Sequence, residues 1–510
     1  MPVLNWIGKE AVVNHDKEVP FRLLKKVKSL SYGENSQNLI IHGDNLEALK
    51  ALMPYYQGKV KCIYIDPPYN TGNEGWVYND KVNSPKIKKW LGKVVGSESQ
   101  DLCSHDKWLC MMYPRLKLLR ELLSEDGVIF VSIDDNEQVN LKLLMNEVFG
   151  SENTIGNFVW RKKAGAGADS KLMFKQHEYI IFYAKNINML TNFYEPLNEK
   201  QLREYKNPDN DKRGLWAPTD LTAPSSDLDD SRLYEIISPT GKKWLKRWSY
   251  TQKNLEELRK LDLIWFGKDG NSMPKRKRFL SEKKGLVPRS WIDWVLTSQG
   301  KMDIEFIFGK ETRIFNYPKP TKLISHLIRI ASDKDSIVLD SFAGSGTTGH
   351  AVLDLNKEDS GNRKFILIEM EDDIAKNITT ERIKRAIEKF DYKAGFEFCE
   401  LDKPLFNESG QISDECTFDQ LATYIYFTET NTNIDTKEIA GNFIGNYDET
   451  EYYLLFKERG NNILSKEFIK KLQTNNKKKV IYADKCLIDE RTLEKHKIQF
   501  KQIPYEVKVY

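Results

Sequence analysis

A glycine-rich turn between a strand and a helix is the feature that most restricts how this chain of 510 residues can fold. The segment SIVLDSFAGSGTTG begins as a buried strand, and its Gly344, Gly346 and Gly349 fit the spacing GxGxxG at a helix start. Glycines at these places let the backbone approach a nucleotide-like ligand closely. Glu369, 20 residues after Gly349, ends the next predicted strand, where an acid can hold ribose hydroxyls. A glycine-rich turn without a ligand is the alternative.

The segments around this turn alternate between strand and helix patterns, which is typical of a parallel α/β sheet. Upstream, the predicted strands are NLIIHGD, VKCIYID, GVIFVSID and HEYIIFYAK, and the predicted helices are NLEALKALMPYY, HDKWLCMMYPRLKLLRELLSEDG (with a bend at Pro114) and NEQVNLKLLMNEVFG. Downstream, a helix is predicted over 317–332, then the strand KFILIEME and a further helix. From about residue 400, the segments YYLLFK and KVIYAD predict strands of a separate small α+β unit.

A second turn, in IYIDPPYNTG, follows another of the predicted buried strands. Proline has no backbone donor, so the strand must end at Asp66. A simple turn is one interpretation, and a clamp for a flat substrate is another. A carboxylate (Asp66) and a backbone carbonyl (Pro67) are hydrogen-bond acceptors for an exocyclic amine, while Pro68 stiffens the turn and Tyr69 offers a face for an extruded base. The candidate catalytic residues are Asp66, Pro67, Pro68 and Tyr69.

Both turns resemble motifs of S-adenosylmethionine-dependent DNA aminomethyltransferases. The hallmark Phe-x-Gly-x-Gly corresponds to Phe342, Gly344 and Gly346, and the Asp-Pro-Pro-Tyr turn matches the N6-adenine enzymes. N4-cytosine enzymes more often carry Ser at the first place, so Asp66 favours adenine over cytosine. The resemblance implies that S-adenosylmethionine is the cofactor, that Asp340 approaches its methionine part and that Glu369 holds its ribose.

The order of the motifs, with the catalytic turn first and the cofactor turn last, resembles the beta arrangement of this family. Circular permutation of this kind is tolerated because the termini of a domain often lie close together. The resemblance implies a Rossmann-like fold with a mostly parallel seven-stranded sheet, and places Asp44 and Asn45 near the cofactor adenine. The candidate cofactor-binding residues are Asp44, Asn45, Asp66, Lys319, Asp340, Phe342, Gly344, Gly346, Thr347 and Glu369.

A basic and aromatic block lies between the two turns. Residues 241–290 hold 15 Lys/Arg and 5 Asp/Glu, a local balance of +10, whereas the whole chain has +4. Basic residues mixed with tryptophans suit phosphate contact and base stacking, although a solvated charged face over a small core is the alternative. The candidate DNA-binding residues are Lys242, Lys243, Trp244, Lys246, Arg247, Trp248, Lys275, Arg276, Lys277 and Arg278.

The length of the chain favours several domains, and its cysteine usage favours a reducing cytosol. The six cysteines are scattered without a CxxC pair, which argues against a structural zinc site, and we expect no metal. The N-terminus lacks a signal-peptide pattern, which favours the cytoplasm, and the resemblance to DNA methyltransferases implies a prokaryotic cell and association with the nucleoid. The predicted domains are the catalytic part of the methyltransferase (1–190), an inserted target-recognition region (191–300), the cofactor part (301–395) and a C-terminal α+β domain (396–510).

The chain as a whole is similar to the modification subunit of type III restriction–modification systems. That resemblance implies double-stranded DNA as substrate, a homodimer and a separate helicase-nuclease restriction subunit. No helicase phosphate loop GxxxxGK[ST] occurs in this chain. The alternatives are a stand-alone adenine methyltransferase, an N4-cytosine methyltransferase, a catalytically silent DNA-recognition subunit and a nicotinamide-dependent oxidoreductase.

Overall fold

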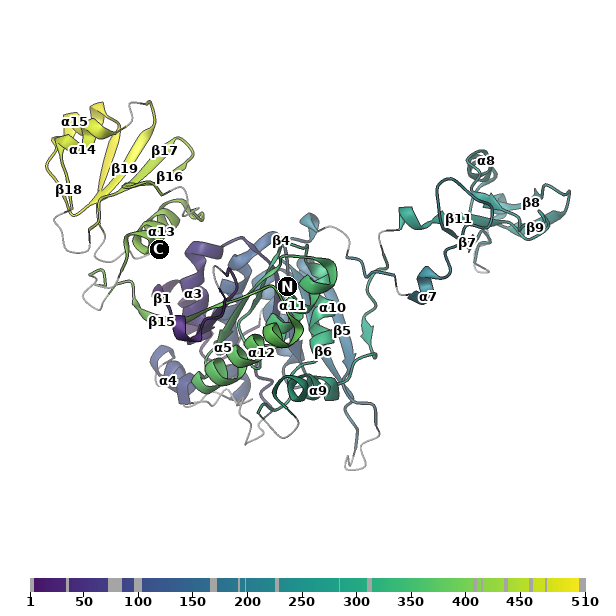
Figure 1. Ribbon diagram of the computed structural model, residues 1–510, viewed down its shortest axis with the longest axis horizontal. Coiled ribbons are helices and arrows are strands. Elements are labelled where there is room, and N and C mark those ends of the chain that lie inside the picture. Colours follow the sequence, from purple (N-terminus) through teal and green to yellow (C-terminus); the bar gives the residue numbers. More distant parts are fainter. Residues whose placement is uncertain are drawn as a thin grey trace. The chain divides into compact units, whose positions relative to one another are not determined.

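The computed structural model divides the chain into two compact units, Asn192–Pro288 and the remainder, which we describe separately (Figure 1). The structure describes residues 4–33, 36–71, 85–95, 103–165, 172–190, 193–197, 199–224, 229–283, 285–309, 314–406, 411–413, 416–434, 439–457, 462–472 and 475–503. Gly72 of the second turn therefore lies outside the described residues.

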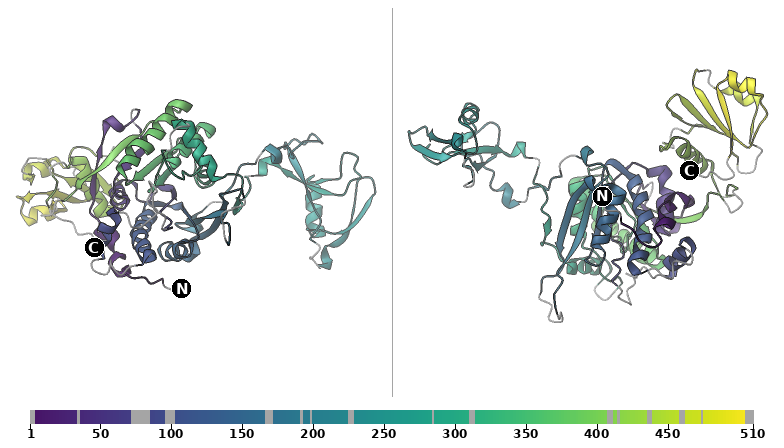
Figure 2. Two further views of the ribbon diagram at one scale, coloured as in Figure 1. Left: turned by 90° about the horizontal axis from the view of Figure 1, so that it is seen from below. Right: turned by 180° about the vertical axis from the view of Figure 1, so that it is seen from behind.

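A ten-stranded sheet forms the centre of the larger unit (Figures 1 and 2). Its strands, in spatial order, are β1 (Arg22–Lys26), β15 (Glu397–Pro404), β2 (Leu39–His42), β14 (Lys364–Glu369), β13 (Ile337–Asp340), β3 (Val60–Ile65), β4 (Leu123–Ile133), β6 (His177–Ala184), β5 (Thr154–Arg161) and β12 (Trp291–Ile292). Among the neighbouring strands of this sheet, only the pairs β1–β15, β4–β6 and β5–β6 are antiparallel. The predicted mostly parallel α/β class is confirmed, but the predicted count of seven strands is wrong.

Helices pack in two groups beside this sheet (Figure 1). One group joins α3, α5 and α6, and the other joins α10, α11 and α12. Helix α5 runs unbroken through Pro114. The helices are α1 (Lys9–Val12), α2 (His15–Glu18), α3 (Asn45–Tyr56), α4 (Pro85–Val94), α5 (Ser104–Leu122), α6 (Gln138–Phe149), α9 (Thr297–Phe308), α10 (Thr321–Ala331), α11 (Thr347–Asp359) and α12 (Thr380–Phe390), the last preceded by a π-helical turn (Ile374–Thr379).

The alternation of side chains along the strands explains why helices cover this sheet. Ile63 and Ile65 of β3 are fully buried and share one hydrophobic core with Leu49 of α3 and Leu116 of α5. The side chain between them, Tyr64, points to the opposite face and is also buried. A strand that is apolar on both faces needs a helical layer on each side, as in other parallel α/β sheets.

Parallel pairing brings the two turns of interest to one edge of the sheet. Strand β13 lies between β3 and β14 and runs parallel to both. The residues at or just after the carboxyl ends of these strands, Asp66, Asp340 and Glu369, therefore meet at the same edge, where open α/β sheets bind their ligands. The glycine turn therefore follows the strand next to β3.

The smaller unit has its own core under a three-stranded sheet and a hairpin. The fully buried Trp248 and Leu221 contribute to this core together with Leu255 of α8. Its elements are α7 (Glu199–Leu202), β7 (Trp216–Asp220), β8 (Leu233–Ile237), β9 (Lys243–Arg247), α8 (Gln252–Lys260), β10 (Ile264–Trp265) and β11 (Lys275–Phe279). Strands β10, β11 and β7 form the sheet, and β8 with β9 forms the hairpin.

The C-terminal part contains a second, four-stranded sheet in the order β16-β17-β19-β21. Its elements are α13 (Phe418–Thr430), β16 (Phe443–Tyr447), β17 (Thr450–Leu454), β18 (Ile463–Leu464), α14 (Lys466–Lys471), β19 (Lys478–Ala483), β20 (Lys485–Cys486), α15 (Glu490–Lys495) and β21 (Ile498–Gln502). Two of the predicted boundaries shift. Strand β15 belongs to the central sheet although it follows residue 396, and β12 belongs there although it precedes residue 300.

None of the helices in the described part of the chain is long and apolar enough to cross a membrane.

Candidate active site

A pocket of about 410 Å³ lies at the carboxyl edge of the central sheet. Residues from both turns line it, and its volume is in the range of small-molecule sites. From the first turn come Asp66, Pro67 and Tyr69, from the second come Asp340, Phe342, Ala343, Gly344, Ser345, Thr347 and Thr348, and further lining includes Asp134, Trp160, Lys162, Lys163, Glu178, Thr297, Tyr317 and Lys319. Most of the predicted catalytic and cofactor residues therefore meet in one cavity.

The turn after β3 is held in place by hydrogen bonds with side chains of other elements. The indole nitrogen of the buried Trp108 donates to the carbonyl oxygen of Pro68 at 2.6 Å. Asn70 adopts a left-handed backbone with φ of 58°, and its side chain donates to Glu137 at 2.6 Å. Because two prolines also restrict φ, the carbonyl groups of this turn are held in fixed directions. Such a turn presents acceptors to a ligand with little further loss of entropy.

Asp66 is the centre of a short polar network. Both of its carboxylate oxygens accept from Lys319 Nζ at 2.6 Å, and Oδ1 also accepts from the hydroxyl of Tyr69 at 2.8 Å. Lys319 Nζ lies 5.1 Å from the centroid of the Tyr69 ring. Tyr69 is buried, with 8% of the residue exposed. The proposed stacking of a base on Tyr69 therefore depends on which face of the ring the ammonium leaves open, and it stays a prediction.

Glu178 is a second carboxylate of this network, and the sequence pattern did not identify it. It lies on β6, accepts from Lys162 Nζ at 2.6 Å through Oε1, and lies 3.3 Å from the Tyr69 hydroxyl through Oε2. Burial alone would raise the pKa of Glu178, but the charges of Lys319 and Lys162 together lower it below its usual value. An ionisable residue at the start of the otherwise apolar strand HEYIIFYA is the signal that could have identified Glu178.

The glycine turn after β13 is held in shape by Glu369. Its carboxylate accepts from the backbone amides of Gly344 and Glu371, both at 2.9 Å, and only 1% of the residue is exposed. Gly344 and Gly346 have positive φ angles of 51° and 77°, which favour glycine. Glu369 therefore supports the turn directly, in addition to any contact with a ribose.

Asp340 lies at the point where β13 enters the turn. It accepts from the amide of Phe342 at 3.0 Å and from the hydroxyl of Thr348 at 2.5 Å. Burial raises the pKa of Asp340 to about 7, and these hydrogen bonds only partly offset that effect. An acid with this pKa, in a pocket, is typical of a functional site and would favour a cationic ligand group.

Arg382 stabilises the glycine turn through hydrogen bonds. The side chain is fully buried, and its Nη1 donates to the hydroxyls of Ser345 and Thr347, both at 2.8 Å. Its Nη2 donates to the hydroxyl of Thr321 at the start of α10 at 3.0 Å. One guanidinium thus ties the cofactor turn to the helix that follows Lys319.

Asp44 and Asn45 are not among the pocket-lining residues. Asp44 caps α3 by accepting from the amide of Leu46 at 2.9 Å. Asn45 is buried and donates to the carbonyl of Ser341 at 3.2 Å, while Arg115 contacts both residues. Asn45 therefore braces the start of the glycine turn, and contact of either side chain with a cofactor adenine stays a prediction.

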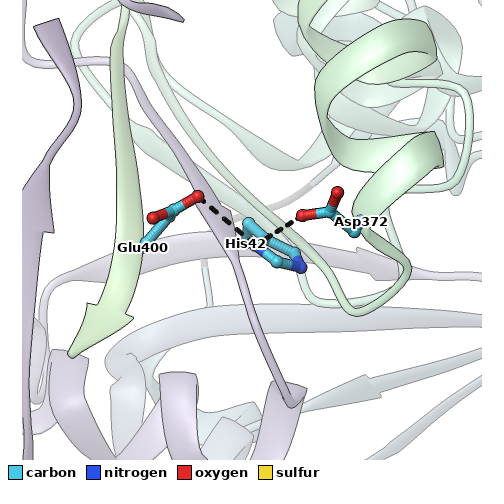
Figure 3. Close-up of side chains that lie close together, drawn as sticks. All are labelled: His42, Asp372 and Glu400. Carbon is cyan, nitrogen blue, oxygen red and sulfur yellow. Dashed lines mark ion pairs between the residues drawn. The ribbon is translucent and has the colours of Figure 1, made fainter. Parts of the chain in front are cut away.

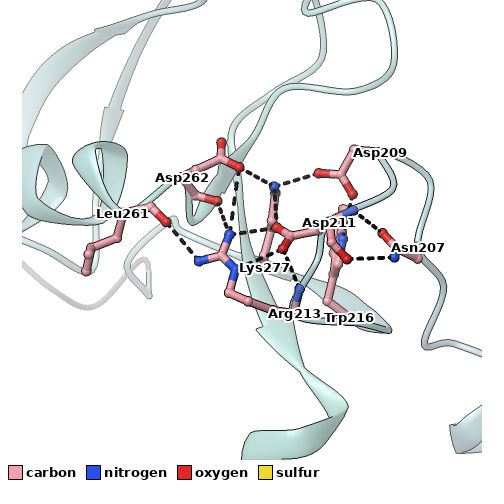
Figure 4. A network of polar contacts seen from close by, with 8 residues as sticks. All are labelled: Asn207, Asp209, Asp211, Arg213, Trp216, Leu261, Asp262 and Lys277. Carbon is pink, nitrogen blue, oxygen red and sulfur yellow. Dashed lines mark hydrogen bonds and ion pairs between the residues drawn. The ribbon is translucent and has the colours of Figure 1, made fainter.

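Two of the predicted DNA-binding residues are structural elements of the smaller unit. Trp248 is fully buried and donates from its indole to the carbonyl of Tyr234 at 2.8 Å, so the prediction that it stacks on a base is wrong. Lys277 is 2% exposed and pairs with three aspartates, so the prediction that it contacts a phosphate is also wrong (Figure 4). Its Nζ lies 2.6 Å from Asp209, 3.0 Å from Asp262 and 3.1 Å from Asp211.

The other predicted DNA-binding residues differ in their exposure. Lys242, Lys243, Lys246 and Arg278 are exposed, while Trp244, Arg247, Lys275 and Arg276 are partly buried. Lys242 Nζ lies 4.5 Å from the centroid of the Trp244 ring. The hairpin β8–β9 thus presents lysines beside an aromatic ring, which is the combination that the sequence analysis expected of a DNA contact.

One group at the sheet edge, His42, Asp372 and Glu400, has the ligand types of a metal site (Figure 3). The imidazole lies 3.4 Å from Asp372 and 3.8 Å from Glu400. However, Lys376 Nζ lies 2.7 Å from Asp372 and 2.9 Å from Glu400. A lysine of the chain itself therefore neutralises both carboxylates, and we assign no metal to this group.

A family model for DNA methylases matches residues 60–382, which include both turns and more than half of the chain. The chain belongs to the DNA methylase family. It is 38% identical over 366 residues to the type III restriction-modification enzyme StyLTI Mod subunit of Salmonella typhimurium, covering 69% of this chain and 55% of that protein. It is 37% identical over 422 residues to the EcoPI Mod subunit of Escherichia phage P1, covering 73% and 64%.

A further relative differs in class and length. The type II methyltransferase M.KpnI of Klebsiella pneumoniae is 31% identical over 377 residues, which cover 69% of this chain and 85% of that protein. The chain thus spans less than two thirds of the two Mod subunits but most of the type II enzyme. Membership of the DNA methylase family disfavours the nicotinamide-dependent alternative and fits a pocket that joins the two turns.

Proposed function

We propose that the chain transfers a methyl group from S-adenosylmethionine to the N6 amine of an adenine in double-stranded DNA. The observation that carries this proposal is the meeting of Asp66 with the glycine turn in one pocket of about 410 Å³. A glycine turn alone would suit many nucleotides. An acceptor turn beside it has a role only if a second, flat substrate enters the same pocket.

The residues around the glycine turn fit S-adenosylmethionine. Gly344 lines the pocket and, like Gly346, has a positive φ angle, while Phe342 offers an aromatic side chain and Asp340 lines the pocket as an acid. Asp340 suits a cationic ligand because ionisation of this buried group is stabilised by a nearby positive charge. When bound, the cofactor supplies a methyl group that is activated by a sulfonium. We assign its binding to Asp340, Phe342, Gly344, Gly346, Thr347 and Glu369, with Asp44 and Asn45 on the adenine side.

The residues of the first turn prepare the acceptor amine. The lone pair of an exocyclic amine is delocalised into the base, so the amine is a weak nucleophile. Asp66 and the Pro67 carbonyl accept its two N–H bonds and draw the nitrogen toward tetrahedral geometry. Catalysis then depends on positioning and on preorganised acceptors, without a covalent intermediate. The target base must leave the duplex to reach this pocket.

Adenine is favoured over cytosine by Asp66 at the first place of the turn. The family description, DNA methylase, does not decide between the two bases. We therefore assign N6-adenine methylation from the Asp-Pro-Pro-Tyr sequence, and N4-methylcytosine is the outcome that would correct this assignment.

We assign DNA contact to the exposed basic residues of the smaller unit. Lys242, Lys243 and Lys246 lie on or just before β9, and Arg278 lies on β11. Exposed lysines of this kind neutralise phosphates and add affinity without sequence preference. Trp244, Arg247, Lys275 and Arg276 are partly buried and are assigned a smaller share of the DNA contact.

We further propose that the chain acts as the modification subunit of a type III system in a prokaryotic cytoplasm, close to the nucleoid. The supporting observation is its 34–38% identity to three Mod subunits. This proposal implies a homodimer and a restriction subunit in a separate chain. The similar coverage of a type II methyltransferase supports the stand-alone alternative.

One experiment separates these possibilities. Genomic DNA from a methylation-deficient host that expresses this chain is sequenced with detection of modified bases. N6-methyladenine at one short sequence supports the proposal, and co-purification of a separate restriction subunit adds support for the type III assignment. Detection of N4-methylcytosine instead would show that the target base is cytosine. An unmodified genome, together with binding of the chain to DNA, would indicate a catalytically silent recognition subunit.

A further inference from the structure

Two carboxylates flank one lysine in the acceptor half of the pocket. Lys319 Nζ lies 2.6 Å from both oxygens of Asp66 and 3.8 Å from Oε2 of Glu178. The Lys319 and Glu178 side chains are only 11% and 10% exposed, so water screens their interaction weakly. Because Lys319 follows Pro318 and precedes Pro320, its backbone is restricted, and its flexible side chain is the part that can move.

The proposed function requires Asp66 to accept a hydrogen bond from the incoming amine. In the structure, the ammonium of Lys319 bridges both Asp66 oxygens, and the Tyr69 hydroxyl takes a further acceptor position on Oδ1. A bridging ammonium competes with the amine for the same lone pairs. It also opposes the positive charge that the nitrogen acquires as it is methylated.

We propose that Glu178 is the receiving carboxylate of a lysine switch, so that Lys319 moves from Asp66 to Glu178 when the target amine enters. This inference rests on the proposed function, and it makes Glu178 a positioning residue that need not touch the substrate. The switch itself makes and breaks only hydrogen bonds. A movement of about 1 Å brings the 3.8 Å separation to hydrogen-bond length.

The surroundings of Glu178 fit this role. Lys162 Nζ binds Oε1 at 2.6 Å, which orients the carboxylate, while Oε2 is the oxygen nearer Lys319. The hydroxyl of Tyr69 lies 2.8 Å from Asp66 and 3.3 Å from Glu178, so it contacts both positions of the switch. The net lowering of the Glu178 pKa keeps a negative charge ready for the ammonium.

A crystal structure of the full-length Asp66→Asn variant tests the movement without any methyl transfer. The amide keeps the shape of the side chain but loses its charge, so Lys319 should prefer the remaining carboxylate. We expect Lys319 Nζ within about 3 Å of Glu178 Oε2. A lysine that remains at position 66, or that turns out of the pocket, would overturn the switch.

Single-turnover methylation tests whether the switch matters for the reaction. Glu178→Gln should lower the rate by at least about tenfold, while the affinities for S-adenosylhomocysteine and for DNA change by less than about threefold. In a Lys319→Met background, Glu178→Gln should have less than about a twofold further effect, because the lysine that it receives is gone. A wild-type rate for Glu178→Gln, or effects that multiply in the double variant, would refute the inference.

Glu451 offers a matched control in the C-terminal sheet. It is a buried glutamate that accepts from the hydroxyl of Tyr453 at 2.9 Å and lies 3.5 Å from Lys479. Glu451→Gln should therefore reproduce the loss of a buried pair while leaving the methylation rate unchanged. If the wild-type chain methylates no DNA, the proposed function fails, whereas the crystal structure of Asp66→Asn still decides whether the lysine moves.

Discussion

Asp340 gives the larger unit a stability that depends on pH, and Asp340→Asn should remove this dependence. Asp340 is 2% exposed, and burial raises its pKa from 3.8 to about 7. An acid whose pKa is higher in the folded state binds more protons there than in the unfolded chain. Its favourable contribution is complete below pH 3.8 and is lost as the pH rises through 7.

The shift from 3.8 to about 7 sets the size of this effect. One unit of pKa difference corresponds to about 1.4 kcal/mol, so the full shift corresponds to roughly 4 kcal/mol. Between pH 5 and pH 8, the part that is lost is about 2–3 kcal/mol of unfolding free energy. The amide of Asp340→Asn does not titrate, so the variant should not show this loss.

Urea unfolding of cofactor-free protein at pH 5, 6, 7 and 8 measures the difference between wild type and variant. We expect the free energy of unfolding of wild type, relative to Asp340→Asn, to fall by about 2–3 kcal/mol from pH 5 to pH 8. Asp335→Asn, at an exposed position before the same strand, is the matched control and should parallel wild type. A difference between wild type and Asp340→Asn that is constant with pH would refute the assigned protonation.

The remaining predictions concern Asp66, Glu369, Lys277 and Lys242. Asp66→Ala should lower single-turnover methylation by at least about a hundredfold, with calorimetric affinity for S-adenosylhomocysteine within about threefold; a wild-type rate would remove Asp66 from the mechanism. Glu369→Ala removes the acceptor of two buried amides and should weaken cofactor binding by about 1–3 kcal/mol, so an unchanged calorimetric affinity would contradict its role. Lys277→Met should destabilise the smaller unit by about 3 kcal/mol in thermal unfolding. By contrast, Lys242→Met should leave thermal stability unchanged and lower the slope of DNA affinity against salt concentration by about one counterion. A destabilised Lys242→Met variant, together with a stable Lys277→Met variant that has the smaller salt slope, would contradict both assignments.

Much of the central sheet could be predicted because its strands are short apolar runs that end at turn residues. Asp66 and Asp340 follow such runs directly, so the residue pattern alone is enough to place both turns at strand ends. Strand β5 (Thr154–Arg161) was not predicted, since Gly156 and Asn157 interrupt its pattern. The antiparallel direction of β6 was also not predictable, because a run of apolar residues is the same in either direction.

The site could be predicted only where residues are close in sequence. Glu178 lies more than a hundred positions from Asp66 and joins it through the pairing of β6 with β4 and of β4 with β3. Local composition alone predicted DNA contact for Trp248 and Lys277. In the structure, Trp248 is part of the core of the smaller unit, and Lys277 neutralises three aspartates. The exposure of a charged or aromatic residue in a basic block must therefore be known before a role can be assigned to that residue.

Nucleoside mass spectrometry of DNA methylated in vitro tests the central claim most directly. Purified chain, S-adenosylmethionine with a labelled methyl group and unmethylated bacterial DNA are incubated, and the DNA is digested to nucleosides. The account predicts label in N6-methyldeoxyadenosine with wild type and none with Asp66→Ala. Label only in N4-methyldeoxycytidine, or no label in DNA that the protein binds, would contradict it.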